Sequence, residues 1–464
     1  MRRPTGVLGP RDRGDVQADV LDALGFRYAH HLVVCIDDAA AARRLLADAI
    51  ALVPRWPVHG PHKPDLAATI GISGNGLLRL GVDPEFVDGL GPAFAGGMAS
   101  RADVLGDAGA SHPDHWLPGF EEFDANILLW IQGRHVHEVD AEAARWHARL
   151  HDKGLHLVHH IEAAMHGNHR EHFGFADGFS QPLIAGARKG ARENSREEGE
   201  LSRPGEEGEL TRGGREEPIP AGEFLLGHPD AMGVVAPIGY HPLARNGTIL
   251  VWRQLHQDVA AFRAFVARAA VAKALDPVLV AAKLVGRWPD GTSLAVAPTG
   301  PPGGPGRDPG LDPAAPADIR YGDDPLGLRC PVGAHVRRAN PRDGMPQRTL
   351  ANRHRIIRRG LPYGPPLPPD APDDGVDRGL VFAGFNANLA RQFEFLQSLW
   401  FNDGGELNLG TARDPLVGAG GGDHFVVAGH PPHVLTGLPQ FVTTRAGEYF
   451  FVPGISALRA LASG

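Results

Sequence analysis

Residues 249–266, ILVWRQLHQDVAAFRAFV, contain a change of periodicity that decides how this chain folds. An apolar run opens the stretch, Asp258 interrupts it, and Val259, Phe262 and Val266 follow at the spacing of one helix face. A short run rich in β-branched and aromatic residues predicts a strand, and Asp is a favoured residue at a helix N-terminus. The stretch therefore predicts a strand followed directly by a helix.

Three further stretches repeat this pattern of an apolar strand, a polar break and an amphipathic helix. They are residues 31–36 with a helix beginning near Asp38, residues 127–131 with a helix after Asp140, and residues 380–382 with a helix over 389–399. None has a glycine-rich turn between strand and helix, which disfavours a dinucleotide-binding or phosphate-binding loop. Two strand–helix units in each half of the chain predict an α+β protein of two similar domains.

Composition narrows the class of protein. The chain has 464 residues, of which 42% are hydrophobic and 22% charged, so it can bury a sizeable core. Its net charge of -8 argues against nucleic-acid binding, which requires a basic face. Two cysteines, Cys35 and Cys330, exclude a disulfide framework and a four-cysteine zinc site. Because no apolar run could span a bilayer and no export signal is seen at the N-terminus, we expect a cytoplasmic protein without a membrane partner.

Composition also suggests boundaries along the chain. Residues 187–218 are dense in Glu, Arg and Gly and predict a charged surface insertion, and the Pro- and Gly-rich residues 298–318 predict an irregular loop. We therefore divide the chain into an N-terminal extension, an N-terminal domain, this insertion and a C-terminal domain. Their expected ranges are 1–24, 25–186, 187–218 and 219–464.

The 24 histidines make any single one a weak candidate for a metal ligand. The adjacent pairs His30-His31 and His159-His160 are poor chelates, because neighbouring side chains in a strand point to opposite faces. The chain also lacks a His-Glu-x-x-His zinc motif and the Gly-x-Ser-x-Gly motif of hydrolases.

Three short stretches carry candidate chemistry. Residues 173–182, FGFADGFSQP, place Asp177 between glycines and aromatics, where a partly desolvated carboxyl can have a raised pKa. Residues 330–342, CPVGAHVRRANPR, place His335 after small residues and before arginines. Residues 354–364, HRIIRRGLPYG, contain three arginines. Taken singly, each stretch also has an explanation without catalytic function. These are an aspartate in a turn, a solvated histidine in a basic loop and a solvated charged face.

Together, and in this order, the three stretches resemble the haem-dependent dye-decolourising peroxidases. Residues 173–182 are similar to the Gly-x-x-Asp-Gly signature of that family, residues 330–342 to its proximal-histidine segment and residues 355–364 to its distal-arginine segment. The likeness extends over most of the chain from about residue 25. It implies two ferredoxin-like domains of the dimeric α+β barrel type, with one haem b per chain held mainly by the C-terminal domain.

The resemblance also implies roles for single residues. His335 is the expected iron ligand, and Glu394 is the expected acceptor for its second N–H. Asp177 is the expected acid and base toward hydrogen peroxide, and Arg358 is expected to stabilise the charge that develops as the O–O bond breaks. Arg358 is preferred to its neighbour Arg359 on the spacing to the following glycine.

Further residues are expected around the haem. Arg355 is expected to pair with a haem propionate, and the remaining cofactor-binding candidates are Gly174, Gly178, Leu380 and Phe382. Large substrates would need an aromatic residue near the surface to relay electrons. The candidates by residue type are Trp252, Trp400, Tyr363 and Tyr449.

The expected function is a peroxidase that reduces hydrogen peroxide and oxidises dyes or phenolic compounds in one-electron steps. Its partners are then hydrogen peroxide and an organic reductant, and the sequence does not indicate an oligomeric state. A haem-binding protein for haem handling or iron release is the alternative, but such a protein has no need of a distal acid–base pair. A cofactor-free scaffold of the same fold is a third possibility.

Overall fold

The structure is a computed structural model that describes residues 6–56, 63–121, 124–150, 154–167, 169–178, 181–187, 218–300, 319–345 and 348–464. Nearly all of the charged insertion, and residues 301–318 of the Pro- and Gly-rich segment, lie outside the described residues. In the part of the chain that is described, no helix is long and apolar enough to cross a membrane.

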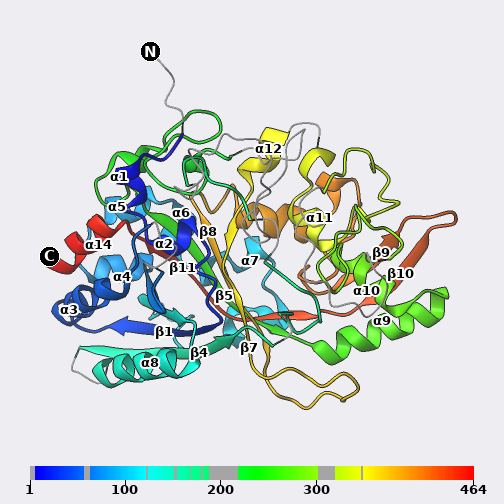
Figure 1. Ribbon diagram of the computed structural model, residues 1–464, viewed down its shortest axis with the longest axis horizontal. Coiled ribbons are helices and arrows are strands. Elements are labelled where there is room, and N and C mark those ends of the chain that lie inside the picture. The colour runs from blue at the N-terminus through cyan, green and yellow to red at the C-terminus, as the bar shows by residue number, and fades with distance from the viewer. Residues whose placement is uncertain are drawn as a thin grey trace.

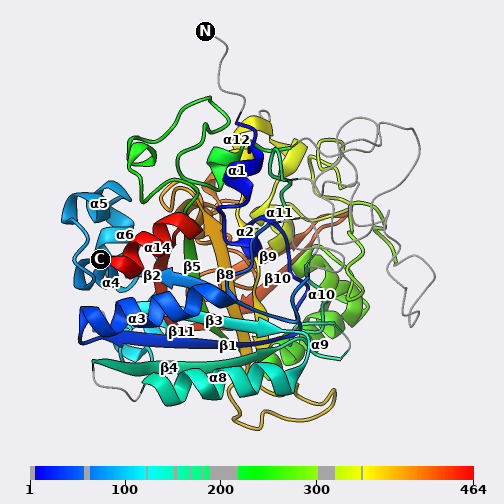
Figure 2. The ribbon, with the colours of Figure 1, turned by 60° about the vertical axis from the view of Figure 1, so that its left-hand side comes forward.

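One antiparallel sheet of nine strands runs through the molecule (Figures 1 and 2). The strands follow the order β4-β1-β3-β2-β11-β5-β8-β6, and β7 also pairs with β8. Their bounds are β1 Tyr28–Ile36, β2 Leu66–Ile72, β3 Ile127–Gly133, β4 Leu155–Ala164, β5 Thr248–Gln257, β6 Ile357–Arg358, β7 Leu361–Tyr363, β8 Gly379–Asn386 and β11 Val442–Val452. A separate hairpin is formed by β9 Gly422–Val427 and β10 His433–Leu438.

The sheet is continuous because β2 and β11 meet in its middle. The contact is narrow, with Ile72 opposite Phe451, and it requires a glycine nearby. A Cβ atom at Gly71 would lie 2.7 Å from the Cβ of Phe450, so only glycine allows the two strands to approach this closely. The main hydrophobic core accordingly contains side chains from both halves of the chain, including Val33 and Phe450.

The helices surround this sheet. Their bounds are α1 Pro10–Arg13, α2 Ala18–Leu21, α3 Ala39–Ala49, α4 Gly74–Arg79, α5 Pro84–Gly89, α6 Pro92–Gly96, α7 Ala102–Leu105, α8 Val136–Leu150, α9 Val259–Lys273, α10 Pro277–Val285, α11 His335–Ala339, α12 Arg348–Arg353, α13 Phe393–Phe395 and α14 Ile455–Ser463. A second hydrophobic core joins α9 and α10 to the β9–β10 hairpin (Figure 1).

The predicted strand–helix units are confirmed where an aspartate caps the helix. The Asp38 carboxylate accepts the backbone N–H of Ala41 at the start of α3, and the Asp258 carboxylate accepts that of Ala261 at the start of α9. The second unit differs in position, because α8 begins at Val136 and contains Asp140 in its second turn. In the fourth unit, the predicted helix over 389–399 is replaced by the single turn α13 and a π-helix over Leu396–Phe401.

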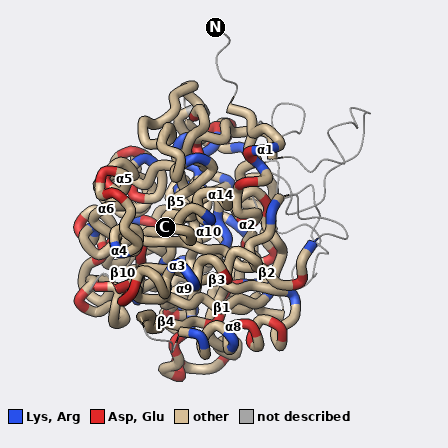
Figure 3. Tube along the Cα trace, turned by 90° about the vertical axis from the view of Figure 1, so that its left-hand side faces the viewer, with Lys and Arg blue, Asp and Glu red and all other residues tan. Residues whose placement is uncertain are grey.

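Charged residues of both signs are interspersed along the face seen in Figure 3, where neither sign forms a continuous stripe. This distribution lacks the basic footprint of a nucleic-acid-binding surface on the face shown.

Candidate active site

The loop that carries Asp177 is folded around the half-buried carboxylate of Glu171, for which the sequence offered no signal. Glu171 accepts the backbone N–H groups of Phe173 and Phe175, each at 2.9 Å, and the side-chain amide of Gln257 at 2.7 Å. The backbone N–H of Ala176 then donates to the carbonyl of Pro289. These contacts hold the loop against β5 and the segment after α10, and they fix the position of the backbone just before Asp177.

Asp177 forms an ion pair with Arg358. Nη1 of Arg358 lies 3.1 and 3.2 Å from the two carboxylate oxygens of Asp177, whose side chain is 52% exposed. Burial acts to raise the pKa of Asp177, but the guanidinium of Arg358 and the backbone N–H of Gly178 outweigh it. The pKa therefore lies below its ordinary value, which is the opposite of the rise expected from the sequence.

Strand pairing separates Arg358 from Arg359. Arg358 pairs with Gly384 in the β6–β8 ladder, and its backbone N–H donates to the side-chain oxygen of Gln181 at 3.0 Å. The side chain of Arg359 points elsewhere: its Nε donates to the carbonyl of Asp19 at 2.9 Å and lies 3.7 Å from the carboxylate of that residue. Adjacent residues of a strand face opposite sides, so only Arg358 is placed against Asp177.

His335 begins α11 and is held by a carboxylate from a distant segment. Its Nδ1 lies 3.2 and 3.1 Å from the two oxygens of Asp414, whose side chain is completely buried. Burial acts to raise the pKa of Asp414. The opposing effects of His335, Arg338 and the backbone N–H of Val417 are larger, so the net pKa is lowered and the carboxylate stays charged. An imidazole that donates Nδ1–H to a carboxylate leaves its Nε2 lone pair available to a metal.

The imidazole of His335 is influenced by several charged side chains. Burial lowers the pKa of His335, whereas Asp414 raises it and gives a net increase; the charges of Arg358 and Asp177 also act on the imidazole. The ring of Phe401 stacks on that of His335, with centroids 5.4 Å apart. His335 is thus fixed by a carboxylate at Nδ1 and by a stacked ring on its face.

The predicted role of Glu394 is wrong. Its carboxylate accepts Nε and Nη2 of Arg101 at 2.8 and 3.0 Å and the hydroxyl of Tyr449 at 3.2 Å. Asp414 occupies the position beside His335 for which Glu394 was expected. Asp414 could not be predicted from the sequence, because it lies 79 residues from His335 and belongs to no recognisable motif.

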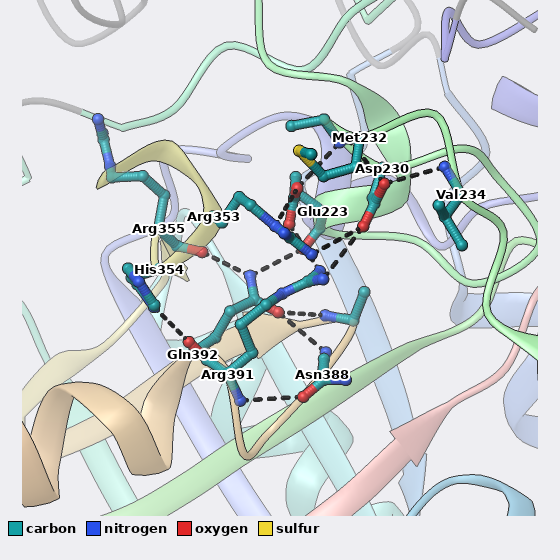
Figure 4. Close-up of polar contacts among 12 residues, drawn as sticks. Glu223, Asp230, Met232, Val234, Arg353, His354, Arg355, Asn388, Arg391 and Gln392 are labelled. Carbon is teal, nitrogen blue, oxygen red and sulfur yellow. Dashed lines mark hydrogen bonds and ion pairs between the residues drawn. The ribbon is translucent and has the colours of Figure 1, made fainter. Parts of the chain in front are cut away.

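Arg355 is only 5% exposed and follows α12 in a segment fixed by ion pairs. Arg353 and Arg391 both contact Asp230 at 3.1 Å, and Gln392 donates to the carbonyl of Arg355 at 2.6 Å. Figure 4 shows the side chain of Arg355 extending away from this cluster. The ion pairs therefore fix the backbone while the guanidinium of Arg355 is directed elsewhere.

The other predicted cofactor contacts lie on β8 and in the loop that carries Asp177. Leu380 and Phe382 are half-buried and alternate along β8, so they project from one face of the strand that pairs with Arg358. Gly174 and Gly178 have φ angles of 99° and 96°, a region that favours glycine, and a Cβ atom at either position would touch nothing within 4 Å.

The four aromatic residues considered for electron relay are not at the surface. Trp252 and Tyr449 are fully buried, and Trp400 and Tyr363 are 1% and 5% exposed. Trp252 packs against Phe120, with ring centroids 5.4 Å apart. These side chains belong to the interior, so they cannot meet a large substrate directly.

Comparison with known proteins places this arrangement in a family. Residues 319–419, which contain His335, Arg358 and Asp414, match the model of the Dyp-type peroxidase C-terminal region. The chain is 31% identical to the multifunctional dye peroxidase DyP2 of Amycolatopsis over 431 residues, which cover 84% of this chain and 81% of the relative. The chain belongs to the dye-decolourising peroxidase family.

Two further relatives cover nearly the whole chain of this dye-decolourising peroxidase. A dye-decolorizing peroxidase of Mycetinis scorodonius is 28% identical over 481 residues, 97% of this chain and 87% of the relative. The solved structure of an ancestral D-type dye decolorizing peroxidase is 30% identical in sequence. The alignment covers 97% of this chain and 99% of the chain in that structure, with a TM-score of 0.78.

Family membership establishes the reaction class and the fold. The protein is a dye-decolourising peroxidase, an oxidoreductase that acts on peroxide and needs an electron-donating substrate. Its α+β fold of helices around antiparallel strands matches the solved relatives. Dye-decolourising peroxidases are haem enzymes, and the donor set fits that group: Asp414 orients His335 so that Nε2 can bind iron.

Proposed function

We propose that the protein binds one haem b per chain, reduces hydrogen peroxide to water and oxidises dyes or phenolic compounds one electron at a time. The observation that carries this proposal is the anchoring of His335 by the buried carboxylate of Asp414, in a chain that also pairs Asp177 with Arg358. When bound, haem supplies the two electrons that reduce the peroxide and regains them singly from the reductant.

His335 is the proposed iron ligand, through Nε2. The buried carboxylate of Asp414 fixes the orientation and tautomer of the imidazole by accepting Nδ1–H. Partial negative charge on the ring makes Nε2 a stronger donor. Asp414 itself is fixed by the backbone N–H groups of Leu416 and Val417 at 2.9 and 3.0 Å, so the pair is preorganised.

Asp177 is the proposed acid and base. Because its pKa is lowered, the side chain is a carboxylate at neutral pH and can accept a proton from one oxygen of hydrogen peroxide. It then returns that proton to the departing oxygen, which leaves as water. Arg358, 3.1 Å away, holds the carboxylate in place and stabilises the negative charge that develops as the O–O bond breaks.

The remaining cofactor contacts are proposed from their positions. The guanidinium of Arg355 is suited to a haem propionate, since it is buried and directed away from the acidic cluster of Figure 4. Leu380 and Phe382 form an apolar wall from β8, which would exclude water from the peroxide site. Gly174 and Gly178 allow the backbone to bring Asp177 close to a flat ligand.

The domain boundaries expected from the sequence, 1–24, 25–186, 187–218 and 219–464, are retained as a proposal. Both halves have the strand order of a ferredoxin-like domain: β4-β1-β3-β2 in the first, and β11-β5-β8 with β6 and β7 in the second. His335, Arg355 and Arg358 all belong to the second half, so it would hold most of the haem.

Substitution of the acid–base residue tests the proposal. In the haem-loaded protein, Asp177→Ala should lower the rate of peroxide-dependent dye oxidation by roughly 100- to 10,000-fold, while haem stays bound. Asp403→Ala, at an exposed position, is the matched control and should leave the rate unchanged. An Asp177→Ala variant with the wild-type rate would refute the assignment and favour a haem-handling protein.

A further inference from the structure

Histidines from two strands come together at one edge of the sheet, where none of the residues assigned to peroxide chemistry takes part. His30 on β1 and His160 on β4 lie on the same face of the sheet, because Glu162 is opposite His30 and His160 is two residues before it. The helix α8 runs beside these strands (Figure 2). Cross-strand pairing thus joins one member of each histidine pair that, taken alone, is a poor chelate.

The donor atoms of this cluster converge. Nδ1 of His30 lies 2.8 Å from Nε2 of His160, and the two rings are nearly parallel, with centroids 5.0 Å apart. A carboxylate oxygen of Glu162 completes a set of three donors that all lie within 4.8 Å of one another. Two imidazole nitrogens on one tetrahedral zinc ion are about 3.3 Å apart, so the rings need to separate by only about half an ångström.

The second nitrogen of His30 has the partner that a metal-bound histidine requires. Nε2 of His30 lies 2.9 Å from a carboxylate oxygen of Asp140 on α8. An Nε2–H donated to this carboxylate sets the tautomer that leaves the Nδ1 lone pair toward His160 and Glu162. The side chain of His30 is 8% exposed, whereas His160 and Glu162 are exposed, so an ion can enter from solvent.

His160 offers its lone pair through Nε2 when its ring proton is on Nδ1. Nε2 is the atom that faces Nδ1 of His30, so this tautomer directs both lone pairs into the cluster.

We propose that His30, His160 and Glu162 form a binding site for a divalent transition-metal ion that favours imidazole, such as Zn²⁺. His30 binds through Nδ1, His160 through Nε2 and Glu162 through its carboxylate, and water fills the fourth position. Asp140 orients His30. The ion links β1 to the edge strand β4 and, through Asp140, to α8, so it stabilises the N-terminal half of the protein.

Calorimetric titration of the haem-loaded, full-length protein with Zn²⁺ in a non-chelating buffer tests this site. The wild type should bind one equivalent with micromolar or tighter affinity. His160→Ala should abolish that binding, and Asp140→Ala should weaken it by roughly 10- to 100-fold. His433→Ala, on the β9–β10 hairpin, is the control and should bind Zn²⁺ as the wild type does.

X-ray absorption at the zinc edge identifies the ligands independently of the haem iron. The wild type should show two imidazoles on zinc, and the signal should be lost in His160→Ala. Because His160 and Asp140 are exposed, both variants should fold, and their far-ultraviolet circular dichroism should match the wild type. Absence of zinc uptake by the wild type, equal uptake by His160→Ala, or a zinc environment without imidazole would each overturn the proposal.

Discussion

The substitution Asp414→Asn tests how the protein orients its iron ligand. One oxygen of Asp414 accepts the backbone N–H groups of Leu416 and Val417, and both oxygens lie near Nδ1 of His335. An asparagine has one oxygen and one NH₂ group in the same volume. If its oxygen stays with the backbone, its NH₂ meets Nδ1–H of His335; if it rotates, its NH₂ meets the two backbone donors instead.

Either arrangement leaves a buried donor unsatisfied, or forces His335 into the tautomer whose Nε2 carries a proton and cannot bind iron. A buried unsatisfied donor costs about 1–3 kcal/mol. At about 1.4 kcal/mol per factor of ten, haem affinity should fall by roughly 5- to 150-fold. The reduction potential of the iron should also rise, because the ring loses its negatively charged partner.

Haem affinity is measured by transfer of haem to an acceptor protein, and the potential by spectroelectrochemistry. Asp403→Asn makes the same change at an exposed position and should alter neither quantity. Glu394→Gln tests the acceptor first expected from the sequence and should leave the potential unchanged. A wild-type potential and affinity in Asp414→Asn, or a shifted potential in Glu394→Gln, would refute this reasoning.

The other predictions concern the arginines and the ligand itself. Asp177 acts as a carboxylate, so activity should be lost as the pH falls through its pKa. Arg358→Leu removes the cation that lowers this pKa. The acid limb of the pH–rate profile should therefore move to higher pH. An unmoved limb would contradict the pairing. Arg359→Leu leaves the carboxylate of Asp19 buried without its cation. In denaturant titrations, the free energy of unfolding should therefore fall by about 3 kcal/mol. The folded variant should keep the pH–rate profile of the wild type. His335→Ala should change the ferric absorption spectrum, and an unchanged spectrum would remove His335 from the ligand role.

Local chemistry was sufficient to predict the two strand–helix units in which an aspartate caps the helix. Asp38 and Asp258 each satisfy a backbone N–H three residues later, an interaction that lies within a single turn of the chain. The helix after β8 could not be read in this way, because α13 and the π-helix that follows it are set by packing against distant segments. Arg101, the partner of Glu394, is 293 residues away in the sequence.

The candidate site was predictable only where a motif holds its residues together. Asp177, His335 and Arg358 lie in recognisable stretches, whereas Asp414 is brought to His335 by tertiary structure alone. The choice between Arg358 and Arg359 depends on the side to which each side chain points, and this is fixed by the pairing of β6 and the residue after it with β8. The same limit applies to His30 and His160, whose proximity follows from strand register.

The most direct test of the central claim is the absorption spectrum of the haem-loaded protein before and after one equivalent of hydrogen peroxide. We predict a ferric Soret band that converts within milliseconds to a high-valent spectrum and returns to the ferric form when a dye is added. A Soret band that only bleaches slowly would contradict the peroxidase mechanism proposed for Asp177 and Arg358, and the absence of a Soret band would contradict haem binding by His335.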